Sequence, residues 1–244
     1  MHDLTALDPR RHLALEGTMN VRDLGGYPTA DGRTTRWRRF LRADKLHILA
    51  EPAREELVGL GLRTVLDLRR GSDLAENPSV FAGSEEVAYH HVDFIGEEPV
   101  EASRPLEGAE WFGDIYCQWL DERRGQVLDI LRTLAAPGAV PALFNCAGGK
   151  DRTGVTAALL LGLAGVPDEV IAEDYSLSGL FLVHRLEEGD PRTAEEYQQD
   201  ASPRRGMEIA LDHLNNRYGG IEPYVLSIGL TAEEVARLRA GLLD

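Results

Sequence analysis

Cysteine and lysine are scarce in this sequence, since each occurs only twice in 244 residues. Cys117 and Cys146 are too few for a disulfide framework or a four-thiolate zinc site, so the sequence predicts reduced thiols in a cytosol-like compartment. Any cysteine chemistry must therefore depend on a single thiol. Lys45 and Lys150 are the two lysines in a chain that otherwise uses arginine for positive charge.

A long hydrophobic run is also lacking. The longest nearly apolar stretch, 155–166, is interrupted by glycine and threonine and is shorter than the roughly 20 residues that cross a bilayer, so it is typical of a buried helix. Residues 1–11 carry charged residues and a proline where a signal peptide would need an apolar stretch. We therefore expect no integral membrane segment and a cytoplasmic protein, with export by a route without a classical signal left open.

Positive charge is in deficit, because 26 Lys and Arg face 41 Asp and Glu and the formal net charge is −15. This balance disfavours nonspecific binding of nucleic acid. One basic run opposes the trend, and it forms either a solvated face around a hairpin or a patch that faces an anion. The run consists of Arg33, Arg36, Arg38, Arg39, Arg42 and Lys45.

Apolar runs and helical stretches alternate along the chain and predict a single α/β domain over 1–244. A short hairpin is expected within 20–32, and an acidic segment broken by glycine and proline is expected to form a helical lid within 168–207. Thr231 and Glu234 match a capping box. The predicted strands are 63–68, 87–94 and 139–144, and the predicted helices are 46–60, 111–134, 153–164 and 232–243.

The loop between the third of these strands and the helix after it carries the residues suited to chemistry. Five residues separate Cys146 from Arg152, and glycines at 148 and 149 allow the backbone N–H groups to curl inward at the positive end of a helix. The planar guanidinium of Arg152 suits two oxygens of a phosphate, and the same field favours a thiolate at Cys146. The sequence therefore predicts an anion-binding cradle.

Other interpretations of this loop are weaker. A nucleotide-binding loop would need Ser or Thr directly after Lys150, where the chain has Asp151. A zinc site lacks partners at ligand spacing, because the nearest histidines in the sequence are His91 and His184. A buried structural cysteine is the plainest alternative, and the spacing to Arg152 argues against it.

The loop resembles the signature of cysteine-dependent protein tyrosine phosphatases. Its full form, Cys-x-x-Gly-Lys-Asp-Arg-Thr-Gly, is similar to that of a bacterial tyrosine-phosphatase-like family with activity on proteins and phosphoinositides. Other motifs of this family occur in the expected order over nearly the whole chain. They are Asn20–Gly26, Leu41–Leu46, Asp67–Arg69, Glu173–Tyr175 and Tyr218–Gly220.

The resemblance implies a cysteine-dependent phosphatase fold, in which helices flank a central mixed sheet, and it implies neither a metal nor a cofactor. The expected substrates are phosphorylated protein, at tyrosine and also at serine or threonine, and phosphoinositide. In the expected mechanism Cys146 forms a phosphocysteine, Arg152 and the loop amides hold the phosphate, and Thr153 stabilises the sulfur as a leaving group. The expected phosphate-binding residues are Ala147, Gly148, Gly149, Lys150, Asp151 and Arg152.

A general acid must protonate the leaving oxygen, and the sequence leaves several candidates. Asp67, at a predicted strand end, and Asp151, in the loop, come first, followed by Asp93 and Asp114. The family resemblance also links Lys150 to the second phosphate of a phosphoinositide.

One residue departs from the family pattern in a way that should affect the rate of catalysis. Asn145 stands where the family has a histidine that orders the loop and favours the thiolate. We expect a weaker enzyme, and the alternative is a pseudophosphatase that binds phosphorylated ligands without turning them over.

Overall fold

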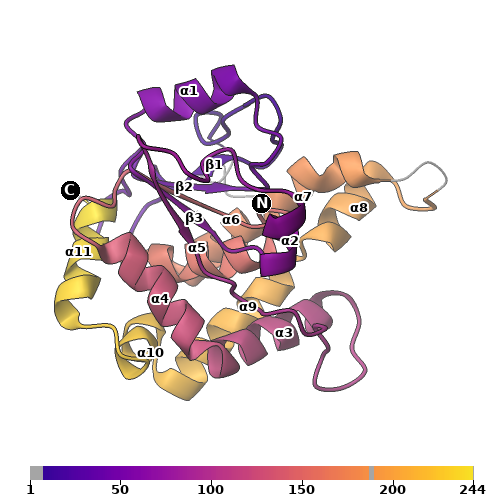
Figure 1. Cartoon of the computed structure of the whole chain (residues 1–244). Coiled ribbons are helices and arrows are strands. Elements are labelled where there is room, and N and C mark those ends of the chain that lie inside the picture. The colour runs from indigo at the N-terminus through magenta and orange to yellow at the C-terminus, as the bar shows by residue number, and fades with distance from the viewer. Residues whose placement is uncertain (1–7, 187–189, 244) are drawn as a thin grey trace.

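A five-stranded mixed sheet forms the centre of the computed structural model, which describes residues 8–186 and 190–243 (Figure 1). The strands lie in the order β1-β2-β5-β3-β4, with β1 antiparallel to β2 and the other pairs parallel. In chain order, β1 to β5 are Arg22–Asp23, Phe40–Ala43, Thr64–Asp67, Ala88–His91 and Ala142–Asn145. The central mixed sheet predicted for a phosphatase fold is thereby confirmed.

Strand β5 lies in the middle of this sheet. Its last residue, Asn145, is paired in register with Ala43 of β2 and Asp67 of β3. Ligand sites of parallel sheets gather at the carboxyl ends of the strands. The loop after β5 therefore leaves the sheet between the ends of two neighbouring strands.

Helices cover both faces of the sheet, with α1 on one side and a larger group that includes α4, α5 and α11 on the other (Figure 1). The first six, α1 to α6, are Glu51–Gly59, Gly71–Glu76, Gly108–Glu122, Arg124–Ala135, Asp151–Leu163 and Asp168–Ser176. The others, α7 to α11, are Ser178–Leu182, Ala194–Ala201, Arg204–His213, Ile221–Ser227 and Ala232–Leu242. A 3₁₀ helix, η1 (Val183–Arg185), and a π-helical turn, η2 (Leu214–Tyr218), complete the described elements.

Alternation along the buried strands divides the interior into two cores. In β5, Phe144 belongs to the large core with α3 to α6 and α9 to α11, whereas Leu143 belongs to the small core with α1. In β2, Phe40 and Leu41 separate in the same way. Successive side chains of a strand point to opposite faces, so both faces of the sheet are apolar and covered.

Several predicted boundaries differ from the observed ones. Strand β2 was not predicted, and the helix expected over 46–60 begins at Glu51, because Ala50 is extended and a proline occupies the first turn. The helix expected over 111–134 is divided at Arg123, whose backbone leaves the helical region. The hairpin is reduced to one bridge between Pro28 and Thr34, and β1 pairs with β2 instead.

Two predictions near the carboxyl end have different outcomes. The capping box is confirmed, since the Thr231 side chain accepts a hydrogen bond from the Glu234 N–H at the start of α11. The segment expected to form a helical lid, 168–207, contains α6, α7, η1, α8 and the start of α9, and its residues 187–189 lie outside the described ones. Val170, Ile171, Ala172 and Tyr175 of α6 belong to the large core, so a lid would consist of α7, η1 and α8, and this role stays a prediction.

Helix α3 packs closely against α9 because Gly113 has no side chain. A Cβ atom at Gly113 would lie 2.7 Å from the Cβ of Ile209. We expect Gly113→Ala to lower the free energy of unfolding by about 1 to 3 kcal/mol, as overpacking does, and urea titration measures this change. Gly125→Ala in α4 is the control, because a Cβ there would meet no atom within 4 Å. Equal stability of the two variants would contradict this account of the packing.

Candidate active site

The loop between β5 and α5 presses against the end of β2. The Cys146 N–H donates to the Ala43 carbonyl at 3.4 Å, and the Cys146 side chain is buried. Gly149 has a φ of +63°, and a Cβ there would lie 2.7 Å from the carbonyl carbon of Ala43. Both the conformation and the close approach therefore require glycine at position 149.

Hydrogen bonds from outside the loop hold its carbonyl groups. The Asn20 amide donates to the carbonyls of Gly148 and Gly149 at 3.0 and 3.2 Å, and Arg42 donates to the Gly149 carbonyl at 2.8 Å. In a planar trans peptide the N–H points opposite to the C=O. The N–H groups of Gly149 and Lys150 consequently point away from these partners and toward the inside of the loop.

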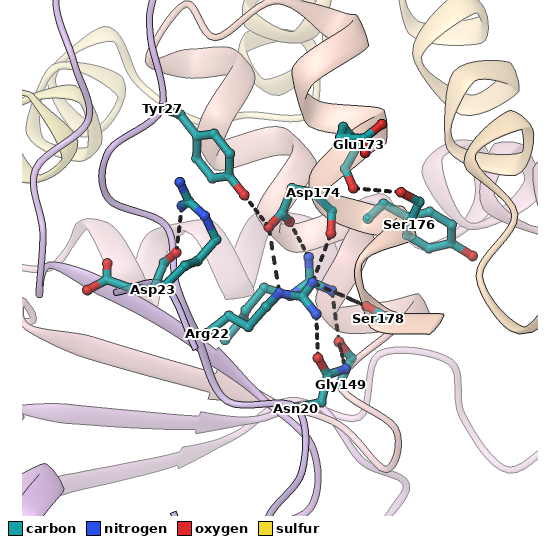
Figure 2. A network of polar contacts seen from close by, with 12 residues as sticks. Asn20, Arg22, Asp23, Tyr27, Gly149, Glu173, Asp174, Ser176 and Ser178 are labelled. Carbon is teal, nitrogen blue, oxygen red and sulfur yellow. Dashed lines mark hydrogen bonds and ion pairs between the residues drawn. The ribbon is translucent and has the colours of Figure 1, made fainter. Parts of the chain in front are cut away.

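Two arginines behind the loop, Arg22 and Arg42, lie against Asp174 of α6, and Figure 2 shows Arg22 beside Asp174. Arg42 forms an ion pair with Asp174 Oδ2, and the Nε of Arg22 lies 3.8 Å from Oδ1. The Tyr27 hydroxyl donates to Oδ1 at 2.7 Å. Arg22 also donates to the side-chain oxygen of Asn20, which connects this buried cluster to the loop.

Burial sets the protonation behaviour of this cluster. Burial and the neighbouring charge of Arg42 lower the pKa of Arg22 to about 9. Burial also disfavours the charge of Asp174, but the guanidinium groups of Arg42 and Arg22 hold the pKa of that carboxyl below its ordinary value. Two guanidinium groups share one carboxylate, so the cluster places excess positive charge behind the loop.

Arg152 and Thr153 lie in the first turn of α5. Arg152 is half-buried and donates to the Leu68 carbonyl at 3.3 Å, beyond the end of β3. Thr153 is fully buried, and its hydroxyl has no hydrogen-bond partner among the described residues. The Thr153 side chain is therefore not a cap for α5, because a capping hydroxyl would accept a backbone N–H.

Asn145 is fully buried immediately before the cysteine. Neither its amide nitrogen nor its amide oxygen has a hydrogen-bond partner in the part of the chain that the structure describes. Buried polar atoms are usually paired, and an exception at this position indicates a functional or strained site. The Asn145 side chain therefore forms no hydrogen bond to a backbone group of the loop.

Asp151 is the only one of the four candidate acids that lies in the loop. Its Oδ1 accepts a hydrogen bond from the Tyr116 hydroxyl and lies 3.1 Å from Lys150 Nζ, while the side chain keeps 33% of its area exposed. Tyr116 is paired in turn with the Tyr175 hydroxyl at 2.7 Å. Burial and the Asp151 charge raise the pKa of Tyr116 well above its ordinary value, so the phenol stays a donor. No sequence pattern indicated this role, because Tyr116 lies within a predicted helix among other aromatic residues.

Lys150 turns away from the inside of the loop. Its Nζ donates to the Ala201 carbonyl at 2.7 Å and lies 3.8 Å above the ring centre of Phe112, and the residue is buried. A cation near an aromatic face, a carbonyl and a carboxylate is well stabilised. In this structure Lys150 therefore links the loop to α3 and α8.

The other candidate acids are engaged elsewhere. Asp67 is fully buried and its two oxygens accept hydrogen bonds from the Arg69 guanidinium at 3.0 and 2.8 Å. Asp93 accepts backbone N–H groups of Gly71 and Gly96. Asp114 accepts hydrogen bonds from Ser103 and Gln118 on the exposed side of α3. Cys146, Asp151, Arg152 and Thr153 thus lie within the loop after β5 and the first turn of α5, whereas Asp67 is held in a separate ion pair with Arg69.

Within residues 8–186 and 190–243, no three His, Cys, Asp or Glu side chains are grouped so that they could hold a metal ion. Over the same ranges, no helix has the length and apolar character needed to span a membrane.

A central parallel strand that leads through a Cys-x5-Arg loop into a helix defines the architecture of cysteine-dependent phosphatases. A family model described as the tyrosine phosphatase family matches residues 13–244, and the chain belongs to this family. It is therefore a tyrosine-phosphatase-like hydrolase of phosphoric monoesters, and its substrates are phosphorylated molecules.

Two relatives illustrate the similarity. A tyrosine-protein phosphatase of Nostoc commune is 31% identical over 83% of this chain and 74% of its own length. The triple specificity protein phosphatase PtpB of Mycobacterium tuberculosis is 26% identical over 94% of this chain and 98% of its own.

The charge cluster behind the loop generates a prediction on stability. Asp174→Asn leaves two buried guanidinium groups without their carboxylate, and we expect the free energy of unfolding to fall by about 3 to 5 kcal/mol in urea titrations at neutral pH. The control is Asp31→Asn, which removes an exposed partner of Arg33 and should change little.

The contribution of Asp174 to the free energy of unfolding should depend on pH. The folded state lowers the pKa of Asp174 below its ordinary value of about 3.9, so its contribution is complete above that pH and is lost as pH falls through the folded pKa. The stability difference between wild type and Asp174→Asn should therefore shrink as the pH falls below the ordinary carboxyl pKa of about 3.9. A difference that stays constant over this range would contradict the charge account.

Proposed function

We propose that the protein hydrolyses phosphotyrosine through a phosphocysteine intermediate on Cys146. The observation that carries this proposal is the buried cysteine in a loop whose outer carbonyls are held by Asn20 and Arg42. This arrangement leaves loop amides free to receive the oxygens of a phosphate. The location of the loop at the start of α5 adds the positive end of a helix dipole.

The proposed reaction has two steps. The Cys146 sulfur attacks phosphorus, the bond from phosphorus to the ester oxygen breaks, and that oxygen takes a proton. Water then loses a proton to the carboxylate that acted as the acid and attacks the phosphocysteine, the phosphorus–sulfur bond breaks, and inorganic phosphate and the Cys146 thiolate are released. The N–H groups of residues 147–152 and the Arg152 guanidinium hold the equatorial oxygens in both steps.

Asp151 is the proposed general acid. The contacts from Tyr116 and Lys150 are both to Oδ1, and Oδ2 is proposed to carry the proton for the leaving oxygen. Asp67 is the weaker candidate because its oxygens are occupied by Arg69. The buried Tyr116 and Tyr175 hydroxyls are proposed to position the Asp151 carboxyl.

Thr153 is proposed to donate to the Cys146 sulfur when it leaves in the second step. Its hydroxyl is buried and has no partner within the described residues, so it is free to turn toward a neighbouring acceptor. The unpartnered amide of Asn145 carries the alternative proposal of a pseudophosphatase, because the residue before the cysteine does not order the loop through its side chain.

Substrate range is the finer part of the proposal. The PtpB relative is named a triple specificity protein phosphatase, which supports a substrate range wider than phosphotyrosine alone, and we propose phosphoserine and phosphothreonine as further substrates. The family resemblance links Lys150 to the second phosphate of a phosphoinositide and so to phosphoinositide turnover. Its contacts with Ala201 and Phe112 support a structural role for Lys150 and give a phosphoinositide less support than a phosphorylated protein.

Cys146→Ser tests the nucleophile. We expect hydrolysis of p-nitrophenyl phosphate to be abolished while inorganic phosphate still binds, because the loop amides and Arg152 remain. Wild-type activity should be inhibited by vanadate and unaffected by a chelator. Full activity of Cys146→Ser would overturn the mechanism, and a wild-type protein that binds phosphate without turnover would establish the pseudophosphatase.

Asp151→Asn tests the general acid through the leaving group. We expect kcat to fall about 100-fold or more on phenyl phosphate, whose leaving group needs a proton, and to fall much less on p-nitrophenyl phosphate. Asp67→Asn is the matched control, since it removes a buried partner of Arg69 and should not change the ratio of the two rates. A ratio altered by Asp67→Asn alone would transfer the role to Asp67.

A further inference from the structure

A pocket of about 450 Å³ borders the outer side of the catalytic loop. It lies between the turn at 17–19, the turn that follows β2, and the 3₁₀ helix η1. The side chains that matter for its chemistry are Met19, Asp44, Lys45, Ile48 and Arg185.

One residue that lines the pocket, Arg185, also contacts the loop. Arg185 Nη2 donates to the Ala147 carbonyl at 3.4 Å, and a Cβ atom at Gly148 would lie 3.5 Å from Arg185 Nη1. Asn20, which follows Met19 in the chain, donates to the Gly148 carbonyl at 3.0 Å. A group in this pocket would therefore lie beside the rim of the phosphate loop.

Lys45 gives the pocket an available cation. No carboxylate of residues 8–186 or 190–243 forms a salt bridge with Lys45, whereas Arg38 and Arg42 of the same basic run are paired with Asp23 and Asp174. The run is therefore divided, with most of its charge used within the fold and Lys45 left at the pocket.

Asp44 is the counter-charge within the pocket, and backbone groups already satisfy it. Its carboxylate accepts the N–H groups of Met19 and Asn20 at 3.1 to 3.3 Å and is almost completely buried. Among the lining side chains, Lys45 and Arg185 exceed Asp44 by one positive charge, and His184 is the remaining titratable group. One additional carboxylate would balance this set.

Apolar side chains form the other part of the lining. Met19 and Ile48 are 46% and 54% exposed, and they are two of the four large hydrophobic side chains that are exposed among the described residues. Their clustering beside one cation indicates a surface that recognises an apolar and an acidic group together.

We propose that this pocket is a subsite for an acidic residue with an apolar neighbour in the peptide that flanks the phosphotyrosine. The inference rests on the proposed function. An extended peptide advances about 3.3 Å per residue, so a position close to the phosphotyrosine reaches the loop rim. A polyphosphorylated inositol ring fits less well, because the pocket has a single excess positive charge and two apolar walls.

Matched peptides test this subsite. The peptides carry Glu or the isosteric Gln at one of the two positions before or the two positions after the phosphotyrosine, with Leu beside the varied residue. The KM of each Glu peptide is compared with that of its Gln counterpart. We expect a KM for Glu that is about two- to fivefold lower at one position in the wild-type protein. Lys45→Gln should remove this preference, and added salt should weaken it.

Arg63→Gln is the control for loss of one positive charge. Arg63 is exposed and precedes the first residue of β3, at the end of the strand opposite to the loop. This variant should therefore retain the preference for Glu. The ratio of Glu to Gln peptides is taken within each protein, so a general effect on the loop cancels.

Three results would overturn the proposal. These are equal KM values for Glu and Gln peptides in the wild-type protein, a preference that survives Lys45→Gln, and a larger effect of Lys45→Gln on phosphoinositide than on peptide turnover. Failure of the proposed function is distinguishable, because no peptide would then be hydrolysed. In that case the dissociation constants of the same peptides for Cys146→Ser, measured by fluorescence anisotropy, decide the subsite.

Discussion

The ion cluster of Arg22, Arg42 and Asp174 is the interaction on which the rest of the site depends. It joins β1, β2 and α6, and through Asn20 and Gly149 it reaches the loop that contains Cys146. Buried charges are costly when unpaired, so these elements are stable only when they are assembled together. The geometry of the loop is consequently set by residues more than 100 positions away in the chain.

This cluster also explains why glycines suit the loop. Three donated hydrogen bonds fix the carbonyls of Gly148 and Gly149 on the outside, and Gly149 lies against the backbone at the end of β2. The conformation that satisfies these donors requires a positive φ at Gly149. Preorganised amides do not need to reorient when a charged oxygen arrives, which is the property that an anion-binding loop requires.

The sequence predicted those parts of the protein that local patterns determine. The loop from Cys146 to Thr153 could be located because its spacing, glycines and following helix are contiguous. Strand β2 was missed because Arg42 interrupts its apolar pattern, and a buried arginine has a partner only once α6 has packed. The roles of Tyr116 and Lys150 were missed for the same reason, since their partners come from α6 and α8. Long-range contacts of polar residues are not visible in periodicity.

Asn145 stands where the resembling family has a histidine, and its effect depends on the other positive charges around the loop. A histidine in that position would add local support to an anion, but the two buried guanidinium groups, the start of α5 and Arg152 supply positive charge from other directions. At an effective dielectric constant of about 20, one unit charge still acts over several ångströms with an energy of a few kcal/mol. The positive charge around the loop is therefore distributed over the fold, and a change at Asn145 affects one contribution among several.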